Sequence, residues 1–568
     1  MGINILFLKD FMKKDRVVLG LILPMIAAAP ANLYAQTPLD AGALQQQIER
    51  ESRATAPSYK SIPPTEIAPE VKKAPSKDKF KITVKKFRFE GNTLIGEAEL
   101  LEVVKQYLDH PVSFSELQDA STAIGEAYRA KGWVVRSFVP EQSIKNGVVI
   151  IKIIEAKLGK TKIEADSEVH ISQEKVNKII NSQQKDNEPI NTKKLDRALL
   201  LVDDLPGVSV SGRLREGERY GETDLVLKQT KEAPITGAAI LDNAGSRSTG
   251  SERAHGFAQF VNPLGRGDIT SLYVLGSEGV GFARLEQSFP VGSDGWRVGA
   301  NASIMRYDLV AREFKNLDGE GSAANIGLQA SYPVIRERQK NLYLNLNYDQ
   351  KYFDNSSQGA TSSNYNIKSG TVALNGNIID KFGGGGTNSA SLGFNFGQLD
   401  LRTLDSGEDS DLEGEFSKFS YNISRQQVLT ESFSFYTSLS GQISPEKKLD
   451  SSEMFYLGGP QGVRAYPVSE GGGVDGGIFS AELRWRFLEN FQLSSFYDHG
   501  YVHNNAPTDS YALDGAGLEF AWQSKSGFNL AATWAHRIGD NPNPTATGHD
   551  QDGSLLKNRF WLTISKRF

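Results

Sequence analysis

The most informative part of the sequence is one glycine-rich run, Leu457-Gly458-Gly459-Pro460-Gln461-Gly462-Val463-Arg464-Ala465-Tyr466-Pro467. It interrupts a long series of segments in which apolar and polar residues alternate, and Asp498 follows on the second such segment after it. An arginine and a carboxylate can form a charge-assisted, bidentate ion pair. We therefore expect a loop that folds back into a pore and is held there by Arg464 and Asp498. The alternative is two unconnected charges that both face solvent.

The alternation extends from about residue 232 to the C-terminus. Side chains on a strand point to opposite faces with a period of two, so one face of each segment can meet lipid and the other water. Charges at alternate positions are costly in a packed core but natural in a water-filled lumen. The segments with the clearest apolar face contain Trp296, Val298, Ala300, Ala302 and Ile304; Phe479, Ala481, Leu483, Trp485 and Phe487; Phe528, Leu530, Ala532 and Trp534; and Phe560, Leu562, Ile564 and Phe568.

The length of this region predicts the size of a barrel. Roughly 336 residues, at ~20 per strand and connection, give about 16 antiparallel strands of a transmembrane β-barrel. In the segment that contains Asp498, alternation places Phe491, Leu493 and Tyr497 outward and Asp498 inward. His499 then belongs to the outer face. The alternative for the whole region is a soluble β-sandwich with one wet face.

Composition excludes several classes of function. The chain has 568 residues, a formal net charge of -5 and no cysteine. A weakly acidic chain lacks the basic footprint of a nucleic-acid-binding protein, and a chain without cysteine has neither disulfides nor thiolate metal sites. The seven histidines are scattered, with no H-E-x-x-H or G-x-S-x-G pattern, and the glycines at 383–386 precede no Lys-Ser/Thr pair. We expect no enzyme activity, no cofactor and no metal site.

Residues 1–35 are predicted to be a signal peptide. Lys9, Lys13, Lys14 and Arg16 precede a short apolar run, 17–29, and small residues allow cleavage after Ala35 or Ala31. The alternative is a retained helical anchor. No later run of ~18 apolar residues is present, so insertion into a membrane must be as a β-barrel.

Two short segments follow the signal peptide. Residues 36–58 are predicted to form an amphipathic helix, with Leu39, Ala43, Leu44 and Ile48 on one face. Residues 59–79 form a linker that is rich in proline and charge. A disordered tail is the alternative for the helix.

Residues 80–156 and 157–231 are predicted to be two small α+β domains with a shared order, β-α-α-β-β. In the first, a strand spans 81–89, one helix spans 97–108, and a second helix begins at Ser113 or Ser115 and ends near Gly132. In the second, a strand at 160–165 precedes helices at 172–180 and 191–204, and Leu205-Pro206-Gly207 ends the last helix.

Several motifs resemble those of the two-partner secretion (TpsB) transporters, the haemolysin secretion/activation type. The resemblance rests on Leu205-Pro206-Gly207-Val208, Gly221-Glu222-Thr223-Asp224-Leu225, Asp242-Asn243-Ala244-Gly245, Asn262-Pro263-Leu264-Gly265-Arg266-Gly267-Asp268, Gly462-Val463-Arg464-Ala465-Tyr466 and the terminal Phe568. It covers nearly the whole chain after residue 36.

The resemblance implies roles for particular residues. The two α+β domains correspond to POTRA (polypeptide-transport-associated) domains, and the helix at 36–58 to a pore plug. Gly462, Val463, Arg464, Ala465 and Tyr466 form the motif of an extracellular loop inside the lumen, while Asp498 and Gly500 belong to the barrel wall that it contacts. Phe568 resembles the signal that the barrel-assembly machinery recognises. Ala465 departs from the usual glycine, so we expect a negative φ or an altered loop tip at this position.

The resemblance also implies a function. It predicts an outer-membrane exporter with periplasmic POTRA domains, contacts with outer-membrane lipid, and one client: an unfolded secreted adhesin, haemolysin or toxin. Export is expected to need no nucleotide. The alternatives are a factor that inserts other outer-membrane proteins, and a passive porin.

Overall fold

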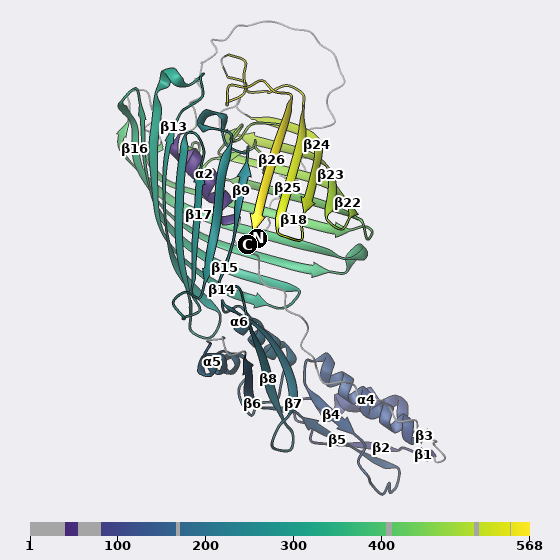
Figure 1. Ribbon diagram of the computed structural model, residues 1–568. Helices are drawn as coiled ribbons and strands as arrows, with labels where there is room; N and C mark the ends of the chain where they lie inside the picture. Colours follow the sequence, from purple (N-terminus) through teal and green to yellow (C-terminus); the bar gives the residue numbers. More distant parts are fainter. Residues whose placement is uncertain (1–39, 55–80, 166–170, 405–411, 505–509, 546) are drawn as a thin grey trace, which may run out of the picture. The chain divides into compact units, whose positions relative to one another are not determined.

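The computed structural model of the protein describes residues 40–54, 81–165, 171–404, 412–504, 510–545 and 547–568 (Figure 1). The predicted signal peptide and the linker at 59–79 lie outside these residues. Within them, no helix has both the length and the apolar character needed to cross a bilayer.

The first α+β domain has a three-stranded sheet covered by two helices. The sheet order is β2-β5-β4, with β2 parallel to β5 and β4 antiparallel to it. Ser113 begins the second helix: the Glu116 backbone N–H donates to Ser113 Oγ (3.3 Å) and the Ser113 N–H donates to Glu116 Oε2 (2.7 Å). The elements are β1 (Lys81–Thr83), β2 (Lys86–Glu90), α3 (Glu97–Val104), the 3₁₀ helix η2 (Lys105–Tyr107), β3 (Pro111–Ser113), α4 (Phe114–Ala130), β4 (Val135–Phe138) and β5 (Val148–Glu155).

One strand prediction in this domain is wrong. The single strand expected at 81–89 is two strands, and the first pairs with β3 in a small separate sheet. The break falls where the Lys85 backbone N–H donates to Gly147 O (2.8 Å) and Val84 O accepts from the Asp109 N–H (2.8 Å). These bonds to distant loops replace the ladder, and alternation along one strand does not reveal them.

The second α+β domain has the same order of elements as the first, but its described residues contain no counterparts of β1, η2 and β3. Its sheet is β6-β8-β7, and its core contains Leu158, Val176, Ile180, Leu199 and Leu227. Asn191 caps the second helix, where its Oδ1 accepts from the N–H groups of Lys193 (3.1 Å) and Lys194 (3.3 Å). The elements are β6 (Lys157–Ala165), α5 (Gln173–Gln183), α6 (Thr192–Asp203), β7 (Val208–Glu216) and β8 (Glu222–Lys231).

The remaining chain forms a closed antiparallel barrel of sixteen strands, which confirms the predicted fold class. Each strand pairs with the next in sequence, and the last pairs with the first. The strands are β9 (Ile235–Asp242), β10 (Arg253–Val261), β11 (Ile269–Gly276), β12 (Val280–Val291), β13 (Trp296–Asp308), β14 (Gly319–Arg336), β15 (Lys340–Ser357), β16 (Ala360–Asp380), β17 (Gly386–Leu404), β18 (Gly414–Val428), β19 (Phe433–Ile443), β22 (Asp475–Leu488), β23 (Phe491–His503), β24 (Tyr511–Gln523), β25 (Phe528–Ile538) and β26 (Asn558–Arg567).

Short elements occupy the connections. In the described part of these connections, four named elements are 3₁₀ helices and two are strands that pair with each other inside one long loop. They are η3 (Arg247–Thr249), η4 (Lys315–Leu317), η5 (Phe382–Gly384), η7 (Ser451–Glu453), β20 (Phe455–Tyr456) and β21 (Gly472–Gly473).

The two faces of the barrel wall follow the predicted alternation. On β13 the side chain of Ile304 is 65% exposed, whereas Ser303 and Met305 on either side of it are buried. Ile326 and Leu328 on β14 are also exposed, and both belong to the outer face. An apolar outer surface of this kind suits lipid contact.

The seam between the first and last strands is short. β26 and β9 share five Cα pairs, from Thr563↔Asp242 to Arg567↔Ala238. Phe568 extends the pairing, because its backbone exchanges two hydrogen bonds of 3.1 Å with Gly237. At the other end, the Asn243 carboxamide accepts from the Leu562 N–H and donates to Phe560 O, both at 2.8 Å. The side chain of Asn243 thus continues the ladder where β9 stops.

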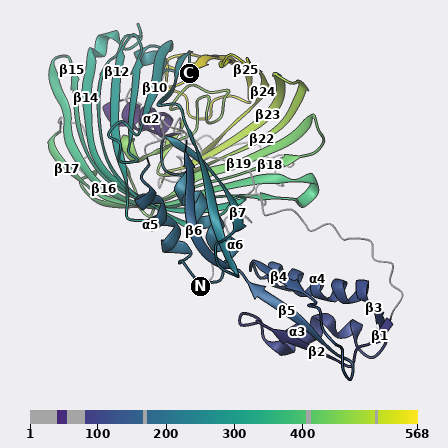
Figure 2. The ribbon, with the colours of Figure 1, turned by 60° about the horizontal axis from the view of Figure 1, so that its bottom comes forward.

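Helix α2 (Ala41–Ala54) lies inside the ring of strands (Figures 1 and 2). The predicted helix was longer, and residues 36–39 and 55–58 lie outside the described part of the chain. The predicted apolar face is correct for Ala43, Leu44 and Ile48, which are buried. Leu44 and Ile48 pack in one cluster with inward residues of the barrel wall, including Tyr273, Phe282, Met305, Phe353 and Tyr365. The lumen is therefore not wet throughout, because α2 covers an aromatic patch on its wall.

Candidate functional site

The site is built on the loop at 444–474, between β19 and β22, which we term the lumenal loop. It turns back onto the inner wall, where Leu457, Val463, Ala465 and Tyr466 are fully buried. These residues form one apolar cluster with wall residues Ile478, Phe496, Val502, Leu513 and Ala535. The loop is thus folded into the barrel and packed there.

Arg464 is held by two carboxylates on neighbouring strands. Its Nε and Nη2 donate to Asp498 Oδ2 (2.9 Å) and Oδ1 (2.8 Å), and its Nη1 donates to Glu482 Oε1 (2.9 Å). The Arg464 backbone N–H also donates to Asp498 Oδ2 (3.2 Å). Asp498 is fully buried and Arg464 is 7% exposed. The structure thus brings together the two residues that the sequence pattern paired.

Other residues complete the Arg464 site and were not predicted. Ser480 Oγ donates to Asp498 Oδ1 (2.9 Å), and the Phe496 ring lies 3.5 Å from the guanidinium carbon. Ser480 lies directly opposite Asp498 in the ladder between β22 and β23, and Glu482 opposite Phe496. Alternation placed all of these residues on the inner face, but only the register brings them together, and alternation does not fix the register.

Small residues let the loop approach the wall. A Cβ on Gly500 would lie 2.7 Å from Val463 Cγ2, and a Cβ on Gly515 would lie 2.7 Å from Ala465 Cβ. Ala465 is not among the described non-glycine residues with positive φ, so its backbone has the negative φ expected for alanine here. Gly500 therefore contributes space for the loop.

The loop also contacts the last hairpin and helix α2. Trp561 Nε1 on β26 donates to Arg464 O (2.8 Å), and the Arg537 guanidinium carbon on β25 lies 4.3 Å from the Tyr466 ring centre. On the other side, Ser451 Oγ donates to Asp40 at the start of α2 (2.6 Å), and Gln46 Nε2 donates to Met454 O (2.9 Å). Helix α2 and the lumenal loop therefore lie against each other.

Further polar contacts attach α2 to the wall. Ser303 Oγ donates to Glu49 Oε1 (2.8 Å), and Arg253 Nη1 donates to Glu51 Oε2 (2.9 Å). Arg253 in turn holds Asp242 at the end of β9 through Nε (2.8 Å) and Nη2 (3.1 Å). These contacts are non-covalent, and the chain has no cysteine to replace them with a disulfide.

The arrangement has the character of a latch. The charged groups of the Arg464 site face one another, and within the described residues no group of three or more histidines and carboxylates is placed to hold a metal ion. Removing one partner of a buried ion pair is expensive, by about 3–5 kcal/mol, because it strands the other charge. Such a site holds a loop in one position.

Comparison with known families gives two matches. Residues 221–521 match the model of the haemolysin secretion/activation protein family ShlB/FhaC/HecB. Residues 82–156 match the ShlB-type POTRA domain.

Individual proteins resemble the chain over most of its length. It is 27% identical to the heme/hemopexin transporter protein HuxB of Haemophilus influenzae (strain 86-028NP), over 93% of this chain and 95% of that protein. It is 24% identical to the outer membrane transporter CdiB of Dickeya dadantii (strain 3937), over 80% of this chain and 81% of that protein.

Two solved structures share the fold. CdiB from Escherichia coli superimposes with a TM-score of 0.71 at 21% identity, covering 94% of this chain and 100% of that one. BamA from Haemophilus ducreyi lacking POTRA domains 1–3 gives a TM-score of 0.51 at 15% identity, with 86% and 100% covered.

Proposed function

We propose that this chain, which belongs to the haemolysin secretion/activation family of two-partner secretion (TpsB) transporters, receives its secreted partner unfolded and passes it through the barrel without nucleotide hydrolysis. The barrel lies in the outer membrane and the POTRA domains lie in the periplasm. The rim that carries the lumenal loop is thus extracellular.

One observation carries the proposal. The lumen contains α2 and the lumenal loop, and only non-covalent contacts hold these two segments against the barrel wall. α2 is attached through hydrogen bonds such as Ser303–Glu49 and through the packing of Leu44 and Ile48. A helix of 14 residues is marginal alone in water, so α2 gains its order from the wall and loses it on leaving. A client segment that replaces these contacts can take the place of the plug.

The POTRA domains offer a physical means of receiving an extended chain. β4 ends the sheet of the first domain, and β6 and β7 end that of the second. A strand at the edge of a sheet can accept another strand through backbone hydrogen bonds, which are indifferent to sequence. We expect the client to bind these edges while it is unfolded.

The energy source is inferred to be the client's own folding outside the cell, which prevents return through the pore. The periplasm supplies no ATP. We expect no enzyme activity.

A secretion assay tests the proposal. A candidate secreted partner is expressed with and without this protein, and the medium and the periplasm are assayed for that client. We expect client in the medium only when this protein is present, and export by the purified protein in liposomes without nucleotide. Export that requires ATP, or that proceeds equally without this protein, would falsify the proposal.

A strain that lacks this protein also tests the alternative function, a factor that inserts outer-membrane proteins. The fold shared with BamA suggests this alternative. An inserting factor lowers the amounts of unrelated outer-membrane barrels when it is deleted. We expect those amounts to be unchanged. We also expect the cell's barrel-assembly machinery to recognise the terminal Phe568 of this chain and to insert its barrel into the outer membrane.

A further inference from the structure

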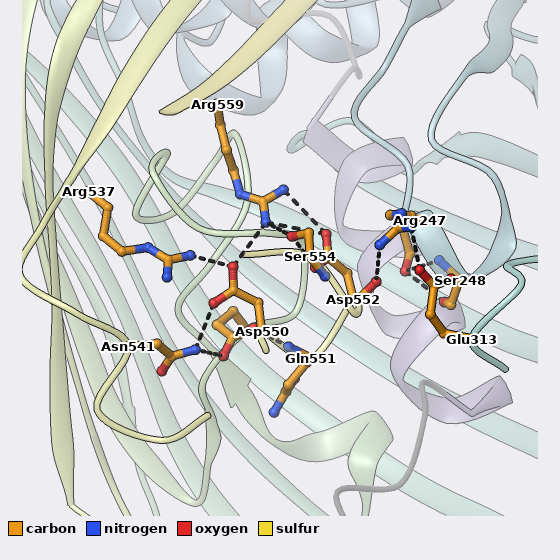
Figure 3. Close-up of polar contacts among 12 residues, drawn as sticks. Arg247, Ser248, Glu313, Arg537, Asn541, Asp550, Gln551, Asp552, Ser554 and Arg559 are labelled. Carbon is orange, nitrogen blue, oxygen red and sulfur yellow. Dashed lines mark hydrogen bonds and ion pairs between the residues drawn. The ribbon is translucent and has the colours of Figure 1, made fainter. Parts of the chain in front are cut away.

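The last extracellular loop, residues 539–557 between β25 and β26, contains two buried carboxylates. Asp550 is fully buried and Asp552 is 6% exposed. Arg537 at the end of β25 donates to Asp550, and Arg559 at the start of β26 donates to both Asp550 and Asp552 at 3.3 Å (Figure 3). Two wall guanidinium groups thus balance two loop carboxylates, as burial of charge requires.

The turn that presents these carboxylates is fixed locally. Asp552 Oδ1 accepts from the Ser554 N–H (2.9 Å) and hydroxyl (2.5 Å), and the Asp550 N–H donates to Ser554 O (2.8 Å). Gly553 has φ +74°, which a side chain rarely adopts. The loop therefore arrives at the two arginines with its carboxylates already oriented.

The same loop reaches the lumenal loop. Asn541 Nδ2 bridges Glu470 Oε1 (2.8 Å) and Asp550 Oδ1 (2.9 Å), and the Gln551 N–H donates to Glu470 Oε2 (2.8 Å). Glu470 is 1% exposed and belongs to the returning arm of the lumenal loop. Arg537, which Asp550 holds, lies over the Tyr466 ring beside Arg464.

A contact across the seam extends this arrangement. Arg247, in the loop after β9, donates to Asp552 O (3.3 Å) and to Glu313 Oε1 (2.5 Å) (Figure 3). The last loop is therefore attached to the first strand's side of the barrel as well as to its own hairpin.

We propose that the closing-loop cluster, defined as Arg537, Asn541, Asp550, Asp552 and Arg559, positions the lumenal loop as a second anchor, separate from the Arg464–Asp498 pair. The arm at 465–474 bonds to the facing arm of the same loop, where the Leu457 and Gly458 N–H groups donate to Glu470 O (3.0 and 2.9 Å). These bonds order the loop internally but do not attach it to the last hairpin. The cluster holds that arm at Tyr466 and at Glu470, so the loop is fixed at both ends of its buried part. Asp550 and Asn541 act through Arg537 and Glu470, and they are positioning residues.

The proposal goes beyond export itself, because it concerns the position of a loop, and its test needs no secreted client. The chain has no cysteine, so a pair of spin labels can be placed at will. Gln461→Cys labels the exposed tip of the lumenal loop, and Ala390→Cys labels the outer face of β17. The distance between the labels is measured by pulsed electron resonance in the full-length protein in liposomes.

We expect one narrow distance distribution in the parent protein. Asp550→Asn and Asn541→Ala should each broaden it by about twofold, because loop motions freed from a packed contact span several ångströms. Asp540→Asn is the matched control: Asp540 lies in the same loop and pairs only with exposed Lys557 (3.2 Å) in the described structure, so its removal should leave the distribution narrow.

Folding is checked by migration of the unheated barrel on a gel. If Asp550→Asn fails to fold, the distance distribution of Asn541→Ala tests the proposal. Asn541 is neutral, so its removal leaves no buried charge without its counter-ion. A parent-like distribution in the folded variants overturns the proposal. Equal broadening in Asp540→Asn also overturns it, because the effect would then belong to the loop at large and not to the cluster.

Discussion

At the scale of single residues, Arg464 is the group whose loss should matter most. Its guanidinium makes two bonds to Asp498 and one to Glu482. Arg464→Ala removes the only cation that pairs with Asp498 in the described structure, and leaves this buried carboxylate with the Ser480 hydroxyl and a backbone N–H as its donors. The loss should cost about 3–5 kcal/mol in the stability of the docked loop. We expect secretion to fall at least about tenfold while the folded barrel still reaches the outer membrane.

The measurement compares client in the medium with the amount of heat-modifiable barrel. Arg486→Ala is the control, since Arg486 is an exposed arginine on the same strand as Glu482. Normal secretion by a folded Arg464→Ala variant would show that the ion pair has no part in transport.

Glu155 in the first POTRA domain should make that domain sensitive to acid. Burial disfavours its charge, but bonds from the Thr93 and Leu94 N–H groups (2.7 and 2.9 Å) and the Tyr128 hydroxyl (2.9 Å) outweigh burial and lower the pKa of Glu155. A lowered folded-state pKa contributes stability above the ordinary carboxyl value of about 4.3, and this stability is lost as pH falls through the folded-state value.

Urea unfolding at several pH values measures the effect. Trp133 is the one tryptophan outside the barrel region and reports on this domain. The wild-type midpoint should exceed that of Glu155→Gln at pH 7, and the difference should shrink below about pH 4. If the difference in urea midpoint between the wild type and Glu155→Gln does not change with pH, the stabilisation comes from packing and neutral hydrogen bonds and not from the charge of Glu155.

The residue scale also shows where sequence reasoning stops. The pairing of Arg464 with Asp498 followed from a glycine-rich loop and an inward strand position. Glu482 and Ser480 required the register of β22 against β23, in which Ser480 lies opposite Asp498. The closing-loop cluster required the fold of an irregular loop, which has no periodicity to interpret.

At the scale of elements, α2 is held chiefly by its apolar face. Ile48 is 3% exposed and packs against the aromatic patch of the wall. Ile48→Ala should weaken docking by about 2 kcal/mol, which changes the ratio of plugged to open barrels roughly 30-fold. We expect a higher open fraction in planar-bilayer conductance recordings.

Gln47→Ala is the matched control on the neighbouring position. In the described structure the Gln47 side chain bonds only to Glu51 within the helix (3.1 Å). Equal conductance in Ile48→Ala and the parent would mean that the helix does not limit the pore.

The helix also shows what amphipathicity can and cannot predict. The pattern identified Ala43, Leu44 and Ile48 as one apolar face, and these residues are buried. It could not show that the face packs in one cluster with inward aromatic residues from different strands, among them Tyr273, Phe282, Phe353 and Tyr365. From the alternation we predicted an inward face on each of those strands, and we expected that face to meet water along its whole length.

At the scale of the whole molecule, closure depends on the seam between β9 and β26. Five Cα pairs join these strands, whereas β15 and β16 share eighteen. Asn243 adds two side-chain bonds at 2.8 Å to this short ladder. Asn243→Ala should lower the stability of the closed barrel by about 2 kcal/mol, at roughly 1 kcal/mol per bond.

The temperature at which unheated barrel loses its fast gel migration measures this change. Asn243→Asp retains the acceptor for the Leu562 N–H and loses the donor to Phe560 O, so it should fall between the alanine variant and the parent. An unchanged transition in Asn243→Ala would place the weakest point of the barrel elsewhere.

The number of strands and the order of domains were predictable because length, period and turn residues act locally. The weak point of the barrel was not, because it depends on how the two ends of the region meet across the full length of the chain.

The aromatic wall under α2 has a consequence for the resting cell. Withdrawing the helix wets that wall, and exposing apolar surface costs about 25 cal/mol for each square ångström. We therefore expect α2 to return to the wall spontaneously in a copy without client, and so to close the barrel without an energy source. Detergents and bulky antibiotics would then be unable to pass through the barrel until a client displaces α2.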